Sequence, residues 1–206
     1  MLKYYLDMKK LVMKTIGITV ASILAVLLII YGIMALGFPK NLASFYDGLG
    51  KNKSATNFMA KAYERSGDIS DLDQTCVYAI KTGDNGLIAE YLGKLVGNDG
   101  FKDYCNATDK GVEYYDFMAS KYIVGYYHVN STDGDIVDKA FLLTDDYRNG
   151  SCAYTLIRTI IGGNKDKEAI NLFKEKLNSA MPNYSQQSKI LAENDLAFIN
   201  EYLNNH

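Results

Sequence analysis

The sequence contains few of the residues from which metal and redox sites are built. Only two histidines, His128 and His206, occur in 206 residues, so neither an HExxH zincin motif nor a His-rich metal site can form. The cysteines, Cys76, Cys105 and Cys152, show no CxxC spacing, which argues against a zinc site and against a thioredoxin-type redox site. We therefore expect no metal and no other cofactor.

The cysteines leave two structural alternatives. Outside the cytoplasm two of the three can pair in a disulfide and leave one over. The interpretation favoured here is that all three are small buried hydrophobic residues, which is the usual role of free cysteine.

Motifs for nucleophilic catalysis and phosphate binding are also missing. GxSxG is absent and nothing marks one serine as a nucleophile assisted by His128, which we expect to be structural or merely exposed. GGNK at 162–165 lacks the spacing of a phosphate-binding loop. The acidic turns NSTDGD at 130–135 and TDDYRNG at 144–150 lack the alternating ligands of a calcium loop. A carboxylate pair for glycoside hydrolysis needs no fixed sequence spacing, so an enzyme of that kind stays open.

Positive charge is scarce beyond the N-terminal region. Residues 1–40 carry five lysines and one aspartate, a net charge of +4, and the formal charge of −2 for the whole chain leaves −6 for residues 41–206. A domain of that sign lacks the basic surface that phosphate backbones require, so we expect no nucleic-acid partner. The basic N-terminal tail is better suited to anionic lipid headgroups.

One long hydrophobic run stands between Lys14 and Lys40, where residues 15–39 carry no charge. A helix of this length crosses a hydrocarbon layer of roughly 30 Å at about 1.5 Å per residue. The alternative is a cleaved signal peptide, whose apolar core runs only about 7–15 residues. The greater length favours a retained transmembrane helix over residues 15–38 that contacts membrane lipid.

The flanking lysines predict the orientation of this helix. Four lysines precede it within the first 14 residues, and three follow between residues 40 and 53. The positive-inside rule then places the basic tail, residues 1–14, in the cytoplasm and the rest of the chain outside it. We expect a single-pass protein of the cell membrane.

Residues beyond the span show the apolar spacing of short helices. Glycine-rich polar clusters such as SGD at 66–68 and TGDNG at 82–86 separate stripes such as Ile69, Leu72, Cys76 and Ile80. TCVYAI at 75–80 and KYIVGYYHV at 121–129 are rich in β-branched and aromatic residues, but their neighbours are helical. The prediction is an all-α domain over 54–206 with about nine short antiparallel helices, after a linker or first short helix at 39–53.

Three segments of this domain resemble tetratricopeptide repeats. In the first segment, Ala60, Tyr63, Gly67, Asp68 and Ala79 stand where that family places a small residue, an aromatic residue, a Gly-Asp turn and an alanine. Leu92, Gly93 and Gly100 fit a second unit, and Gly93 follows Ala60 at nearly the family's period. Ala169, Phe173, Leu177 and Pro182 fit the end of a third unit. The match covers about half of residues 41–206, with irregular spacing across 105–150.

The resemblance implies a scaffold rather than an enzyme. Tetratricopeptide repeats stack into a curved solenoid whose concave face holds peptides or partner proteins. A helical-repeat domain behind an N-terminal anchor is also similar to bacterial envelope proteins that assist secretion or assembly complexes, an analogy at the level of the fold. The use of Lys, Asn, Ile and Tyr is typical of an AT-rich bacterium.

Residues 112–129 carry more aromatic side chains than one core stripe uses. If Tyr115, Ala119, Tyr122 and Tyr126 face inward, then Tyr114, Phe117 and Tyr127 point elsewhere and become candidates for partner contact. The alternative is a central helix that neighbours cover on both sides.

Five Asn-x-Ser/Thr triplets begin at Asn52, Asn106, Asn130, Asn149 and Asn183. In a eukaryotic lumen they would accept glycans, but turns are rich in these residues, and we interpret them as turn chemistry.

The combined hypothesis is a membrane-anchored helical-repeat scaffold that binds a protein or peptide partner in a cell-envelope assembly or secretion context. The alternatives are an anchored enzyme outside the cytoplasm that acts on cell-wall or secreted substrates, and a purely structural spacer.

Overall fold

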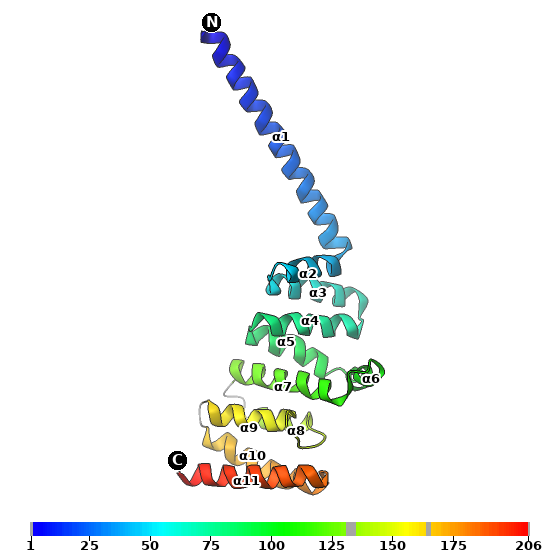
Figure 1. Ribbon diagram of the computed structural model, residues 1–206, viewed down its shortest axis with the longest axis vertical. Helices are drawn as coiled ribbons and strands as arrows, with labels where there is room; N and C mark the ends of the chain where they lie inside the picture. Colours follow the sequence, from blue (N-terminus) through cyan, green and yellow to red (C-terminus); the bar gives the residue numbers. More distant parts are fainter. Residues whose placement is uncertain (1, 131–134, 164–165, 206) are drawn as a thin grey trace.

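The computed structural model describes residues 2–130, 135–163 and 166–205, and these residues form helices without any strand (Figure 1). The prediction of an all-α chain is thus confirmed. The two segments with strand-like composition lie in helices α4 (Ile69–Thr82) and α7 (Gly111–Val129). Apart from the exposed Val129, their β-branched residues are buried or partly buried between neighbouring helices, so tertiary packing overrides their strand propensity.

Helix α1 (Leu2–Gly37) is long and projects away from the rest of the chain (Figure 1). Its Met8–Gly37 segment is long and apolar enough to cross a membrane, and its large hydrophobic side chains are exposed. The helix begins before the hydrophobic run and includes the basic segment that precedes it, because lysine is a good helix former.

Ten α-helices and one 3₁₀ turn follow α1 within the described ranges, against a prediction of about nine. They are α2 (Pro39–Gly48), α3 (Asn52–Ser66), α4, α5 (Asn85–Val96), α6 (Phe101–Ala107), α7, α8 (Ile136–Leu142), α9 (Cys152–Gly162), α10 (Lys167–Ala180), η1 (Met181–Asn183) and α11 (Gln186–Asn205). Figure 1 shows the helices stacked along the long axis of the molecule, with α2 beside the end of α1 and α11 at the far end. Contacts run mainly between neighbours in this stack, and α5 packs directly on α7.

Gly-Asp turns join the first hairpins as the sequence indicates. Gly67 and Gly83 end α3 and α4 in left-handed backbone with φ of 65° and 67°. The carboxylate of Asp68 then accepts a hydrogen bond from the Ser70 amide, and Asp84 accepts bonds from the amides of Gly86 and Leu87. Each turn therefore ends one helix and caps the next one.

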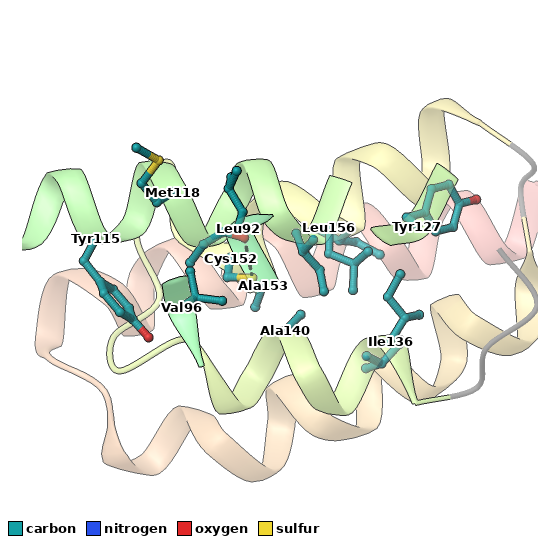
Figure 2. Close-up of a cluster of buried hydrophobic side chains, with 14 of the residues drawn as sticks. Leu92, Val96, Tyr115, Met118, Tyr127, Ile136, Ala140, Cys152, Ala153 and Leu156 are labelled. Carbon is teal, nitrogen blue, oxygen red and sulfur yellow. Dashed lines mark hydrogen bonds between the residues drawn. The ribbon is translucent and has the colours of Figure 1, made fainter. Parts of the chain in front are cut away.

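The main core lies between the stacked helices. Figure 2 shows part of this core, with Leu92 and Val96 of α5, Tyr115 of α7, and residues of α8 and α9 gathered between the helices. Cys76, Cys105 and Cys152 are buried and free, which confirms that they act as small hydrophobic residues. The thiol of Cys152 donates a hydrogen bond to the carbonyl oxygen of Ala119.

The residues assigned to repeat packing lie at helix contacts. Ala60, Leu92 and Phe173 are buried, and Tyr63 and Ala169 are partly buried against the main core. A Cβ atom on Gly93 would lie 3.0 Å from a ring carbon of Tyr122, so glycine allows α5 and α7 to approach. Membership in the tetratricopeptide repeat family stays a prediction.

Candidate functional site

A groove of about 490 Å³ runs along α7, opposite the segment that leads from α8 into α9. We call it the α7 groove. Its lining residues are Glu113, Asp116, Phe117, Ser120, Lys121 and Val124 of α7, Arg148, Asn149 and Gly150 of the connecting segment, and Thr155 of α9. The α7 residues recur every three or four positions, so they form one face of the helix.

Three hydrogen bonds hold the opposite wall in place. Arg148 Nε donates to Asp116 Oδ2 at 2.5 Å, and Ser120 Oγ donates to the carbonyl oxygen of Gly150 at 2.5 Å. Thr155 Oγ1 donates to Ser120 Oγ at 3.2 Å. Gly150 has a φ of 85°, a left-handed conformation that glycine adopts without strain. These bonds attach the loop to α7 and give the groove a fixed shape.

The ion pair at the base of the groove sets its electrostatics. Burial raises the pKa of Asp116, and the hydrogen bond from Arg148 opposes this shift. The same hydrogen bond raises the pKa of Arg148. Arg148 uses only Nε for Asp116, and among the described residues its Nη atoms have no hydrogen-bond partner. They are donors available to a ligand.

The apolar part of the α7 groove is Phe117, with the partly buried Val124 beside it on the same helix face. The Phe117 side chain is 45% exposed, and the ammonium of Lys121 lies 5.5 Å from its ring centroid. Glu113 and Lys121 are exposed on the rim, and neither forms an ion pair within the described ranges. The groove thus combines an accessible aromatic ring with charged groups at its edge.

This arrangement suits binding better than nucleophilic chemistry. The Ser120 hydroxyl donates its proton to a backbone carbonyl, so no base is placed to receive that proton. His128 is exposed on a later turn of α7 and does not line the groove. No group of three or more His, Cys, Asp or Glu side chains with metal-binding geometry occurs in the part of the chain that the structure describes.

The three predicted contact residues have different surroundings. Phe117 is exposed in the α7 groove, whereas Tyr114 is half-buried and donates a hydrogen bond to Asp73. Tyr127 is only 5% exposed, so the expectation that it points away from the core is wrong (Figure 2). The reason is that α7 lies between α5 and α9, and a helix covered on two sides buries more than one stripe.

Most of the groove was not predicted from the sequence. Arg148, Asn149 and Gly150 belong to the segment TDDYRNG, which carries turn residues without helical periodicity. Its position depends on the ion pair with Asp116, a contact between residues far apart in the sequence. Phe117 could be predicted as a contact residue because it lies outside the core stripe of its helix.

A second polar cluster lies around the buried carboxylate of Asp73. Tyr104, Tyr114 and Lys110 all donate to this carboxylate, and the Lys110 ammonium lies over both tyrosine rings. Burial, together with the hydrogen bond to Asp73, raises the pKa of Tyr114. Because every donor is already directed at Asp73, the cluster joins α4, α6 and α7 rather than presenting groups to a ligand.

Comparison with protein-family models, with curated proteins and with solved structures finds no match to this chain.

Proposed function

We propose that the protein is a membrane-anchored helical scaffold that binds a segment of a partner protein, or a peptide, in the α7 groove. In this proposal residues 15–38 cross the cell membrane once, the N-terminus is cytoplasmic, and a domain similar to tetratricopeptide repeats lies outside the cytoplasm. The context is an assembly or secretion complex of a cell envelope.

The observation that carries the proposal is the exposed ring of Phe117 inside a groove of fixed shape. The polar groups at the base of the groove already bond to one another, so a ligand does not need to satisfy them. Covering the exposed part of the ring contributes about 1 kcal/mol, and aromatic residues in such positions are common binding hot spots. The free Nη atoms of Arg148 supply donors for a carbonyl or carboxylate oxygen of the bound segment.

The anchor supports the envelope context. Most large apolar side chains of α1 are exposed between Met8 and Gly37, and this segment is long enough to cross a bilayer. The acidic character of residues 41–206 favours a protein partner over nucleic acid.

An anchored enzyme is the second candidate, and one observation favours it. Glu113 and Asp116 share the α7 groove, and burial raises the pKa of Asp116, as a general acid requires. Against this, Asp116 accepts a hydrogen bond from Arg148, which opposes the rise in its pKa and favours the ionised carboxylate. Binding therefore remains the leading proposal.

Site-specific photo-crosslinking in cells that make the full chain tests the proposal. A photoreactive amino acid replaces Asn149, which is exposed on the wall opposite Phe117. We expect one recurrent protein adduct. The substitution Phe117→Ala should weaken the adduct about fivefold or more, as expected for the loss of about 1 kcal/mol.

Phe198→Ala is the matched control. Phe198 is 50% exposed on α11, at the far end of the stack, so the loss of its ring should leave the adduct unchanged. Recovery of the chain without any adduct, or equal adduct in both variants, would contradict the proposed site.

A further inference from the structure

We infer that the outer face of α2 lies in the headgroup layer of the bilayer that α1 crosses, so that the helical domain rests against the membrane surface. This inference depends on the anchoring part of the proposed function. The surface concerned, which we call the α2 face, consists of Phe38, Phe45 and Leu49, with Lys40 and Arg65 at its edge.

Exposed apolar side chains are found on both α1 and the α2 face. Phe38, the single residue between the two helices, is 56% exposed, and Phe45 and Leu49 are 58% and 54% exposed. After Leu49 the next large hydrophobic side chain with comparable exposure among the described residues is Val112, far along the chain. Phe38, Phe45 and Leu49 therefore form an exposed apolar group beside the end of α1, separate in the sequence from the exposed hydrophobic side chains that begin at Val112.

The length of α1 places this surface at the edge of the bilayer. Tyr31, Met34 and Ala35 pack against the α2–α3 layer, so from Tyr31 onward protein covers one side of α1. From Lys14 to Tyr31 the helix rises only about 25 Å at 1.5 Å per residue, whereas the hydrocarbon layer is about 30 Å thick. The membrane boundary therefore falls level with the last turns of α1, where α2 packs against them.

Aromatic rings gather at that level, as they do in membrane interfaces. Tyr46 of α2 stacks on Phe58 with 5.4 Å between the ring centroids, and the hydroxyl groups of Tyr46 and Tyr31 lie 3.4 Å apart. Phe45 contacts Tyr46 edge-on at 5.6 Å and leaves its outer surface uncovered. Amphipathic aromatic residues of this kind prefer the headgroup region.

Cationic side chains mark the edge of the α2 face. A cavity of about 440 Å³ at the junction of α1 and α2 is lined by Gly37, Phe38, Pro39, Lys40, Asn41, Ala62, Arg65 and Ser66. Arg65 donates to the carbonyl oxygen of Leu36 at the end of α1 and is paired with no carboxylate among the described residues. Lys40 bonds to Asp71 at 2.6 Å while its side chain stays 56% exposed. A bilayer surface combines apolar tails with phosphate groups, so it complements both the apolar side chains of the α2 face and the cationic side chains at its edge.

Tryptophan fluorescence gives a direct test because the chain has no tryptophan. Phe45→Trp makes a single reporter in the full chain, reconstituted in vesicles of phosphatidylcholine and phosphatidylglycerol. We expect blue-shifted emission, with quenching at least about twofold stronger from lipids brominated near the headgroup than from lipids brominated near the chain ends. Phe198→Trp on α11 is the matched control and should show water-like emission without quenching.

A third reporter separates this inference from the anchor. Ile23→Trp lies in the middle of the span and should be quenched by the deeply brominated lipids. Absence of that quenching would refute the anchor itself. If Ile23→Trp is quenched but Phe45→Trp behaves like Phe198→Trp, the anchor stands and the α2 inference fails. Blue-shifted but unquenched emission from Phe45→Trp would also overturn it, because protein, such as a second copy of the chain, would then cover α2.

The phosphate contact has its own test. Arg65→Gln should reduce the shallow quenching of Phe45→Trp in vesicles that contain phosphatidylglycerol and leave the quenching of Ile23→Trp unchanged. Equal quenching of Phe45→Trp with and without the arginine would refute a contact between Arg65 and lipid phosphate.

Discussion

Gly125→Ala should destabilise the helical domain although alanine is the better helix former. Gly125 lies in the middle of α7, where it faces α5. A Cβ atom at this position would lie 2.7 Å from Ile88 Cγ2, 3.2 Å from Ile88 Cβ and 3.3 Å from the amide nitrogen of Ala89. Such distances are well inside van der Waals contact, so the two helices must separate.

The magnitude depends on whether Ile88 can move. Isoleucine in a helix has one strongly preferred χ1 rotamer, so its Cγ2 methyl cannot turn away, and the Ala89 amide is fixed backbone. Overpacking of this kind costs typically 1–3 kcal/mol, against a gain in helix propensity of about 1 kcal/mol. Because neither Ile88 nor the Ala89 amide can move, the cost should fall in the upper part of this range, about 2–3 kcal/mol. We then expect a net loss of about 1–2 kcal/mol, which lowers the Tm by about 2–8 °C for a domain of this size.

Far-UV circular dichroism of the full chain in detergent micelles measures this effect. The helical signal falls as the domain unfolds, while α1 stays helical in the micelle and contributes a constant background. Gly162→Ala is the control, since no atom lies within 4 Å of a Cβ there. Ile88→Leu removes the Cγ2 methyl and should restore part of the lost stability in the Gly125→Ala background. An unchanged or higher Tm for Gly125→Ala would refute the close α5–α7 packing described here.

Three further predictions concern buried polar groups. Asp73→Ala should lower the free energy of unfolding by about 3 kcal/mol, because Lys110 and two tyrosine hydroxyls lose their acceptor. Urea titration measures this change, and a loss below about 1 kcal/mol would contradict the prediction. Burial raises the pKa of Tyr115 and of Tyr184 to about 12 from 10.0, so the folded state keeps protons that the unfolded chain releases. The contribution of these two tyrosines to stability should be constant below pH 10 and should fall between pH 10 and 12. Unfolding midpoints that do not change between about pH 10 and 12 would refute this prediction. The three cysteines should resist iodoacetamide in the native protein and react after denaturation, because all are buried and burial raises the pKa of Cys76 and of Cys152. Mass spectrometry counts the alkylated cysteines, and rapid labelling of the native protein would contradict the prediction.

The helices could be predicted from the sequence because their signals are local. The stripe that contains Leu72 and Cys76 follows the helical period, and Gly67 with Asp68 marks both the end of one helix and the cap of the next. The hydrophobic run likewise identifies the span of α1. The helix begins at Leu2, before the predicted span of residues 15–38, because the lysines that limit a membrane span do not end a helix.

Residues of the candidate site could be predicted only where the position on one helix face determines whether a side chain is exposed. Phe117 falls outside the core stripe and is exposed, whereas Tyr127 has the same sequence signal and is buried by the second neighbour of α7. Arg148 reaches Asp116 from a loop across the groove, a contact that no periodicity encodes. Gly125 gave no signal apart from its small size, because its role depends on Ile88 of another helix.

The most direct test of the anchored-scaffold account is cysteine labelling across the membrane. Asn204→Cys on α11 and Lys10→Cys on α1 each introduce one exposed thiol, while the native cysteines stay buried. With a membrane-impermeant maleimide, the account predicts that Asn204→Cys is labelled in intact cells and Lys10→Cys only after lysis. Labelling of Lys10→Cys in intact cells, or protection of Asn204→Cys until lysis, would contradict the proposed topology.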